Sequence, residues 1–222
     1  MTRIEAVTFD LDDTLVRYER PPGEVLQAAF ERCDLDPLFP VEAYYDRYRE
    51  FAAKTDSMTE LRSECFATLA RERGHDPALA REVATAFDQE RDQSSVELLS
   101  GAAEVLDTLG ERYRLAIVTN GARDAQRAKI EAVDLERWVE TVVIAGQNPP
   151  PKPDPAPFEM AMDALGVRPE TTVHVGDSPD SDVAGANALG MASVLFADGQ
   201  GSGEPEPTYR IDSLAALPSL LG

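Results

Sequence analysis

The stretch that decides the fold is Arg3-Ile4-Glu5-Ala6-Val7-Thr8-Phe9-Asp10-Leu11-Asp12-Asp13-Thr14. Its first seven residues are rich in apolar and β-branched side chains, which is typical of a buried strand. The strand ends in a group of aspartates. Side chains two positions apart in an extended chain point to the same side, so Asp10 and Asp12 can reach one pocket. In so acidic a chain, a helix cap or an acidic turn is an alternative interpretation of these residues.

Strand-like and helix-like runs alternate along the second half of the chain. The strand-like runs span residues 115–118, 142–144, 173–175, 193–196 and 209–211. The helix-like runs span residues 102–109, 124–133, 155–165, 182–189 and 213–221. Asp154-Pro155 supplies a cap and a first-turn proline for one helix, and Gly166 and Gly190 fit helix ends. This alternation predicts an α/β fold with a doubly wound parallel sheet, whose ligands bind at the carboxyl ends of the strands.

Residues 17–96 interrupt this alternation with four amphipathic, helix-like stretches. Their apolar stripes run over residues 25–33, 41–51, 58–69 and 79–87. The third stripe follows a capping box, Ser57-x-x-Glu60, and the fourth follows Asp76-Pro77. The sequence therefore predicts an α/β core formed by residues 1–16 and 97–222, with an all-helical insert at 17–96.

The composition excludes several classes of protein. Of 222 residues, 41 are Asp or Glu and 21 are Lys or Arg, which gives a formal net charge of −20. Such a chain lacks the basic face that nucleic-acid binding requires. No apolar run approaches the roughly 18 residues of a membrane span, and the first residues do not resemble a secretory signal. Cys33 and Cys65 are too few for a disulfide framework and lack zinc-like spacing, so we expect a cytoplasmic protein.

Arginine is strongly preferred over lysine. It fills 18 of the 21 basic positions, and the three lysines are Lys54, Lys129 and Lys152. Abundant carboxylates with scarce lysine resemble the proteins of halophilic archaea, whose cytosol is rich in salt. The alternative is an acidic mesophilic protein that its net charge keeps soluble. On the halophilic interpretation, repulsion between carboxylates destabilises the fold in dilute buffer and is screened at about 1 M salt.

Three further polar clusters follow predicted strands. Thr119-Asn120-Gly121 offers a hydroxyl donor and backbone N–H groups for an oxyanion. Prolines flank Lys152 and would present its ammonium group from a stiff loop. The segment from Gly176 to Asp182 carries three aspartates, of which Asp180 or Asp182 can instead cap the next helix. In a parallel sheet all these clusters are expected at one edge.

Taken in order, the clusters resemble the motifs of the haloacid-dehalogenase-like (HAD) hydrolase superfamily, most closely its magnesium-dependent phosphatases. The order is Asp-x-Asp-x-Thr at 10–14, Thr119 after the second core strand, Lys152 before a helix, and Gly-Asp-x(4)-Asp at 176–182. The resemblance covers nearly the whole chain, since the insert matches the helical cap that many members carry after their first motif. It implies a Rossmann-like core that hydrolyses a small phosphorylated metabolite, with no nucleic-acid or membrane partner.

The resemblance also implies catalytic roles. Asp10 would attack phosphorus and form an aspartyl-phosphate, while Asp12 would act as the general acid and then the general base. Thr119 and the Asn120 N–H would bind phosphoryl oxygens. Lys152 would neutralise the nucleophile and the developing charge.

A magnesium site follows from the same resemblance. Its ligands would be the carboxylates of Asp10 and Asp177 and the backbone carbonyl of Asp12, with Asp182 acting directly or through water. The electrostatics point the same way. Four converging carboxylates would repel one another and a phosphate group unless a cation is present.

Other functions stay open. A 2-haloacid dehalogenase shares the fold and the nucleophile, but it works without metal and lacks an aspartate at the position of Asp12. A phosphomutase shares Asp10 and Asp12, although its capped members commonly have Gly where this chain has Asp13. A phospho-accepting receiver module uses similar residues in another order. A degenerate family member would only bind phosphorylated ligands.

Overall fold

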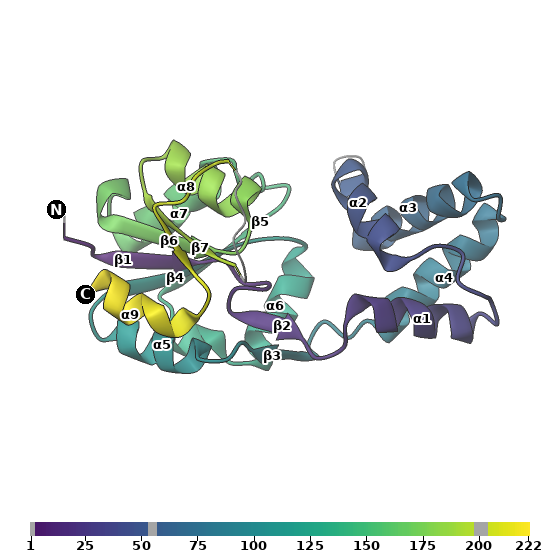
Figure 1. The fold of residues 1–222 in the computed structure, drawn as a ribbon, viewed down its shortest axis with the longest axis horizontal. Coiled ribbons are helices and arrows are strands. Elements are labelled where there is room, and N and C mark those ends of the chain that lie inside the picture. The colour runs from purple at the N-terminus through teal and green to yellow at the C-terminus, as the bar shows by residue number, and fades with distance from the viewer. Residues whose placement is uncertain (1–2, 53–56, 198–203) are drawn as a thin grey trace. The chain divides into compact units, whose positions relative to one another are not determined.

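The structure is a computed structural model that describes residues 3–52, 57–197 and 204–222. The chain forms two compact units, one made of Met1–Arg17 and Val96–Gly222 and the other of Tyr18–Ser95 (Figure 1). Among the described residues, none of the helices combines the length and the apolar character of a membrane span.

The first unit is built on a six-stranded parallel sheet with the order β5-β4-β1-β6-β7-β8. The strands are β1 (Ala6–Phe9), β4 (Arg114–Asn120), β5 (Thr141–Ala145), β6 (Thr172–Gly176), β7 (Ala192–Phe196) and β8 (Tyr209–Ile211). Strand β1 lies in the interior of the sheet and is buried along its whole length. The chain builds outward from it to β5 on one side and then to β8 on the other. This is the predicted doubly wound α/β fold.

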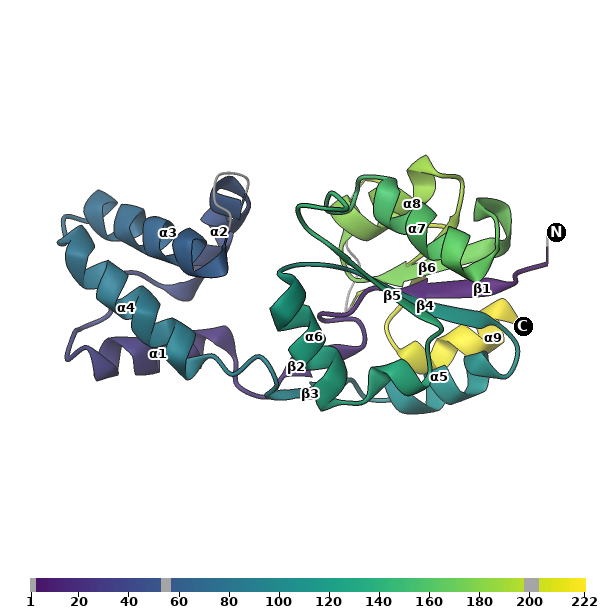
Figure 2. The ribbon, with the colours of Figure 1, turned by 180° about the vertical axis from the view of Figure 1, so that it is seen from behind.

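Helices cover both faces of this sheet. They are α5 (Ala102–Gly110), α6 (Arg123–Ala132), α7 (Ala156–Leu165), α8 (Ala184–Ala188) and α9 (Leu217–Leu221), with short 3-10 turns at Leu135–Arg137, Pro169–Thr171 and Leu214–Ala216. Helices α7 and α8 lie on one face, and α5, α6 and α9 lie on the other (Figures 1 and 2). Phe158 and Leu165 of α7 pack on Ala116 and Val118 of β4. Where the sequence predicted a helix over 182–189, the structure has a π-helical turn, Pro179–Val183, followed by α8.

The second unit contains the four predicted helices, α1 (Pro22–Arg32), α2 (Val41–Ala52), α3 (Met58–Glu72) and α4 (Pro77–Glu90). The predicted caps are present. The Glu60 N–H donates to Ser57 Oγ over 3.2 Å, and the Ala78 N–H donates to an Asp76 carboxylate oxygen over 2.8 Å.

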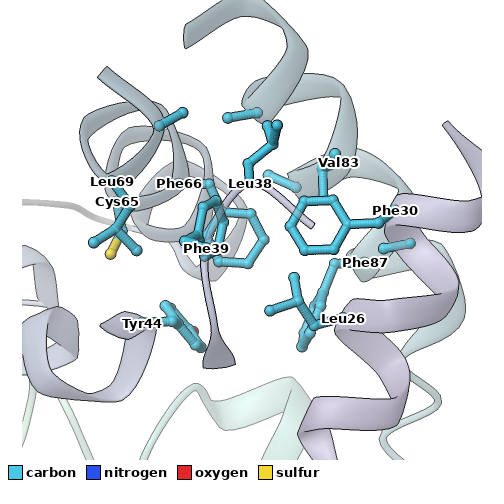
Figure 3. Packing of buried hydrophobic residues seen from close by; sticks show 14 of the residues in the cluster. Leu26, Phe30, Leu38, Phe39, Tyr44, Cys65, Phe66, Leu69, Val83 and Phe87 are labelled. Atoms are coloured by element: carbon cyan, nitrogen blue, oxygen red, sulfur yellow. The ribbon is translucent and has the colours of Figure 1, made fainter. Parts of the chain in front are cut away.

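The apolar stripes of these helices meet in a core of aromatic rings (Figure 3). Phe66 is central to it. Its ring centroid lies 4.9 Å from that of Phe39 and 5.2 Å from that of Tyr44, both in edge-to-face geometry. Such pairs add to the stabilisation from burial, so the unit has a hydrophobic core of its own.

A small two-stranded sheet was not predicted from the sequence. It pairs β2 (Val16–Tyr18) with β3 (Val96–Leu98). The Arg17 Nε–H donates to the Glu97 carboxylate over 2.7 Å, and next to the strands the Glu19 N–H donates to the Ser95 carbonyl over 3.1 Å. Each strand has three residues, which is too short for an alternating pattern to be recognised.

Candidate active site

The predicted site residues lie at the carboxyl ends of neighbouring strands. Asp10 follows β1, Thr119 and Asn120 end β4, and Asp177 follows β6. The Asp10 N–H donates to the Val175 carbonyl over 2.9 Å, which extends the pairing of β1 and β6 to Asp10. Strands β1 and β6 adjoin where the winding of the sheet reverses, the usual ligand position in such folds.

Lys152 is the centre of the site. Its ammonium group donates to Asp10 Oδ1 over 2.6 Å, to Asp182 Oδ1 over 2.6 Å and to the Val118 carbonyl over 2.7 Å. An ammonium group has three hydrogens, so these three bonds use its full donor capacity. The Lys152 side chain is 1% exposed. The structure therefore brings three predicted site residues, Asp10, Lys152 and Asp182, into direct contact.

The Asn120 side chain fixes the backbone of Lys152. The Lys152 N–H donates to Asn120 Oδ1 over 2.8 Å, and Asn120 Nδ2 donates to the Lys152 carbonyl over 3.0 Å. These two hydrogen bonds between the Asn120 side chain and the Lys152 backbone hold the loop that carries Lys152 against the end of β4. The sequence suggested only a backbone role for Asn120, because no local pattern reveals a partner 32 positions away.

Asp182 is buried, and its carboxylate has three hydrogen-bond partners. Besides the Lys152 ammonium, Oδ1 contacts His174 Nε2 at 3.1 Å, while Oδ2 accepts the Ser178 N–H over 3.0 Å. Gly176 makes room for it: a Cβ at that position would lie 2.3 Å from Asp182 Cγ. The Gly-Asp-x(4)-Asp spacing thus has a steric reason in this chain.

His174 contacts the Asp182 carboxylate from strand β6, and no role was predicted for it from the sequence. Its ring is buried, with Nδ1 2.8 Å from Thr8 Oγ1 and its centroid 4.9 Å from that of Phe158. Burial lowers the pKa of His174 despite the opposing effect of Asp182. The neutral ring then accepts the Thr8 hydroxyl at Nδ1 and donates from Nε2 to Asp182, because the carboxylate can only accept.

The carboxylates of Asp10, Asp177 and Asp182 form a compact acidic group, with one oxygen of each lying within 4.8 Å of the others. Burial, opposed by Lys152 and reinforced by Asp182, raises the pKa of Asp10 to about 8. Burial and the charge of Asp182 raise the pKa of Asp177 to about 7. For Asp182, Lys152 and His174 overcome the effect of burial and hold the pKa well below its ordinary range. The raised values show a deficit of positive charge that a hard divalent cation would remedy.

Asp12 and Thr119 belong to a second group, organised by helix α6. Lys129 Nζ donates to both Asp12 carboxylate oxygens, over 2.7 and 2.9 Å. Gln126 Nε2 lies 2.9 Å from Asp12 Oδ2, 2.7 Å from Thr119 Oγ1 and 3.0 Å from the Asn120 carbonyl oxygen, and its two hydrogens are shared among these three acceptors. Neither Gln126 nor Lys129 was predicted. The available signals were their i, i+3 spacing on one helix face and the scarcity of lysine.

Both the sequence and the structure are similar to those of known proteins. A profile of haloacid dehalogenase-like hydrolases matches residues 4–190. N-acylneuraminate-9-phosphatase of Mus musculus is 29% identical over 244 residues, covering 100% of this chain and 95% of the relative. Phosphoserine phosphatase of Thermus thermophilus is 36% identical over 155 residues, covering 69% of this chain and 62% of the relative.

A solved structure shows the same fold. It is that of the HAD hydrolase YfnB from Bacillus subtilis, bound to magnesium, which matches with a TM-score of 0.78 at 21% identity and covers 100% of both chains. The family profile spans most of the sequence, and the full length of the chain aligns with a phosphatase. The chain therefore belongs to the haloacid dehalogenase-like hydrolases, in the phosphatase branch that carries a helical cap after the first motif.

Proposed function

We propose that this enzyme hydrolyses a small phosphate monoester through an aspartyl-phosphate on Asp10, in a reaction that depends on Mg²⁺. The observation that carries the proposal is the buried Lys152 ammonium, 2.6 Å from both Asp10 and Asp182, beside Asp177. A nucleophilic carboxylate, a fixed cation and further carboxylates at one sheet edge are the groups that phosphoryl transfer to an aspartate requires.

Asp10 is the proposed nucleophile. A carboxylate attacks phosphorus only when it is ionised, and the buried position of Asp10 opposes ionisation. The Lys152 ammonium and a divalent cation would both favour the ionised form. This requirement explains why a positive group is placed in direct contact with the nucleophile.

The donor set fits Mg²⁺, which prefers oxygen ligands. Asp10, Asp177 and the backbone carbonyl of Asp12 would hold it, while Asp182, already bonded to protein groups, would contact it through water. The two buried lysines, Lys129 and Lys152, balance two of the four aspartate charges, and a divalent cation would balance the other two. When bound, the metal would neutralise charge on the phosphoryl oxygens.

Thr119, the Asn120 N–H and Lys152 would bind the phosphoryl group. Thr119 Oγ1 accepts a hydrogen bond from Gln126 and approaches the Asn120 carbonyl only at 3.5 Å, so its own hydrogen can turn to a phosphoryl oxygen. Asp12 would protonate the leaving alcohol and later take a proton from the attacking water.

The substrate class follows from the relatives. Their names specify an N-acylneuraminate 9-phosphate and phosphoserine, both small phosphorylated metabolites. We propose the same class for this enzyme, with residues 1–16 and 97–222 as the catalytic core and residues 17–96 as the cap that selects the leaving group. Asp12 argues against a dehalogenase, because that branch of the family lacks an aspartate at this position.

The proposal is tested by release of inorganic phosphate from p-nitrophenyl phosphate and from a panel of phosphate monoesters, with Mg²⁺ and at low and high KCl. EDTA and Asp10→Asn should each abolish turnover, and mass spectrometry after acid quench should locate a phosphoryl group on Asp10. Asp180→Asn is the matched control, because it removes the charge of an exposed aspartate in the π-helical turn that follows Asp177. Absence of turnover in the wild type under every condition, or full activity of Asp10→Asn, would refute the proposal. A rearranged ester in place of free phosphate would indicate a mutase.

A further inference from the structure

Helix α6 presents two buried polar side chains toward Asp12, and neither has a place in the reaction described so far. We infer that Gln126 and Lys129 are positioning residues: they hold the Asp12 carboxylate in place for proton transfer and tie it to Thr119. The inference rests on the proposed function, in which Asp12 is the general acid and base. It adds two residues on which the chemistry would depend without their touching the substrate.

Lys129 contacts both oxygens of the Asp12 carboxylate and, together with Gln126, forms a clamp around it. Its ammonium group lies 2.7 and 2.9 Å from the two Asp12 oxygens, and its side chain is 6% exposed, against 36% for that of Asp12. A flexible lysine normally gains little from an ion pair, because ordering its side chain costs entropy. Here the lysine side chain is buried and already ordered by the surrounding protein, so little further entropy is lost when its ammonium group holds the Asp12 carboxylate. Of the three lysines, Lys129 and Lys152 are both buried against aspartates, and Lys54 lies outside the described residues.

Gln126 connects Asp12 with the proposed phosphate site. Its amide nitrogen lies within 3.0 Å of Asp12 Oδ2, Thr119 Oγ1 and the Asn120 carbonyl. Gly121 leaves space for this arrangement: its φ is +146°, and a Cβ there would lie 3.1 Å from Gln126 Cδ. The loop after β4 and the start of α6 are therefore shaped around the Gln126 amide. One side chain sets the distance between the proposed acid and the proposed phosphoryl-binding hydroxyl.

The clamp is compatible with both halves of the reaction. In the first step the bond between phosphorus and the alcohol oxygen breaks as Asp10 attacks, and the proton on Asp12 goes to the leaving oxygen. In the second step Asp12 takes a proton from the water that attacks the aspartyl-phosphate, which releases phosphate and restores Asp10. Asp12 Oδ1 accepts from Lys129, whereas Oδ2 accepts from both Lys129 and Gln126, so Oδ1 can carry the proton while Oδ2 stays held.

Loss of the clamp should affect esters unequally. An alkoxide is a strong base and needs a proton as it leaves, whereas p-nitrophenolate is a weak base and leaves without one. General acid catalysis contributes about 10²–10⁴-fold where it is needed. The quantity kcat/KM reports the steps up to the first irreversible one, which here is formation of the aspartyl-phosphate, and so isolates the acid function.

The experiment compares kcat/KM for p-nitrophenyl phosphate with that for the best alkyl phosphate of the panel. Lys129→Met and Gln126→Leu should lower the alkyl value by about 10²-fold while the p-nitrophenyl value falls by less than about fivefold. Lys129→Arg, which keeps the charge, should restore part of the loss. Arg127→Met is the matched control: it removes a cation from the same helix, but from an exposed pair with Glu136, and it should leave both values unchanged. A crystal structure of Lys129→Met should show the Asp12 carboxylate turned away from α6.

Three results would overturn the inference while leaving the proposed function intact. One is an equal fall for both esters, as expected from general loss of structure. Another is a raised KM with unchanged kcat, as expected if Lys129 binds the phosphate itself. The third is an unmoved Asp12 in the Lys129→Met crystal structure. A wild type inactive toward every ester would instead refute the proposed function, and this inference with it.

Discussion

Replacing Lys152 with methionine tests the electrostatic centre of the site. Lys152→Met keeps the approximate length of the side chain but removes the charge and three hydrogen bonds, to Asp10, Asp182 and Val118. Asp10 is 7% exposed and Asp182 2% exposed, so water cannot readily replace the ammonium group. The variant would leave two buried carboxylates without their shared cation.

The expected cost follows from this burial. Removing one partner of a buried ion pair costs about 3–5 kcal/mol of unfolding free energy, whereas an exposed pair is worth about 0–1 kcal/mol. For a chain of this size each kcal/mol corresponds to about 2–4 °C in the thermal midpoint, so we expect a fall of about 6–20 °C. The methionine fills similar space, so a cavity adds little.

The cost should also depend on pH. The pKa of Asp10 is raised to about 8 in the wild type, and loss of Lys152 raises it further. A folded-state pKa above the unfolded value means that stability is lost as pH rises. The variant loses more unfolding free energy than the wild type as the pH rises. The difference in unfolding free energy between the two proteins should therefore be larger at about pH 8.5 than at about pH 5.5.

Urea unfolding in EDTA, followed by tryptophan fluorescence, measures this difference. The chain has one tryptophan, Trp138, which lies in the α/β unit and therefore reports on the unit that contains the site. Arg127→Met provides the exposed-pair control. A cost below about 1 kcal/mol for Lys152→Met, or a cost independent of pH, would show that Lys152 is not the buried counter-charge described above.

Three other perturbations test separate features. Mg²⁺ should raise the thermal midpoint more at about pH 8.5 than at about pH 5.5, because protons compete with the metal for Asp10 and Asp177, whose pKa values are about 8 and 7. Asp177→Asn should remove most of this increase. An equal shift of the midpoint at both pH values, measured by differential scanning fluorimetry, would contradict the prediction. Gly176→Ala should lower the free energy of unfolding by about 1–3 kcal/mol and remove most of the activity, because the new Cβ would lie 2.3 Å from Asp182 Cγ. Gly23→Ala is the control, because its Cβ would lie 3.6 Å from the Val41 side chain. A fully active and stable Gly176→Ala variant would contradict the prediction. Raising KCl from about 0.1 M to about 2 M should raise the thermal midpoint steeply if the acidic composition is a halophilic adaptation, and a flat response would reject that interpretation.

The strand ends and the order of the motifs were predictable from the sequence because local patterns encode them. An apolar run followed by polar residues marks the end of a buried strand, and this holds at Asp10, Thr119 and Asp177. The inserted helical region was predictable in the same way, from the change from alternating strands and helices to helical stripes.

The partners of the site residues were not predictable, since they depend on the path of the chain after each strand. The chain does not stay extended beyond Asp10. Asp13 has a φ of +56°, and the Leu15 N–H bonds back to the Leu11 carbonyl over 2.9 Å. This turn directs the Asp12 carboxylate to α6, where Lys129 holds it, so Asp10 and Asp12 lie in two hydrogen-bonded groups. The two-residue alternation of side chains along a strand does not predict such a turn.

The small β2–β3 sheet bears on whether the helical unit can be exchanged. The two crossings of the chain between the units are adjacent, with Arg17 bonded to Glu97 and Glu19 bonded to Ser95. The two ends of the segment between them therefore lie side by side. If a segment of another length or sequence replaced it, the entropic cost of closing the loop would change only slowly with the length of the segment. That segment can therefore be exchanged as a module while Asp10, Lys152 and Asp182 keep their contacts.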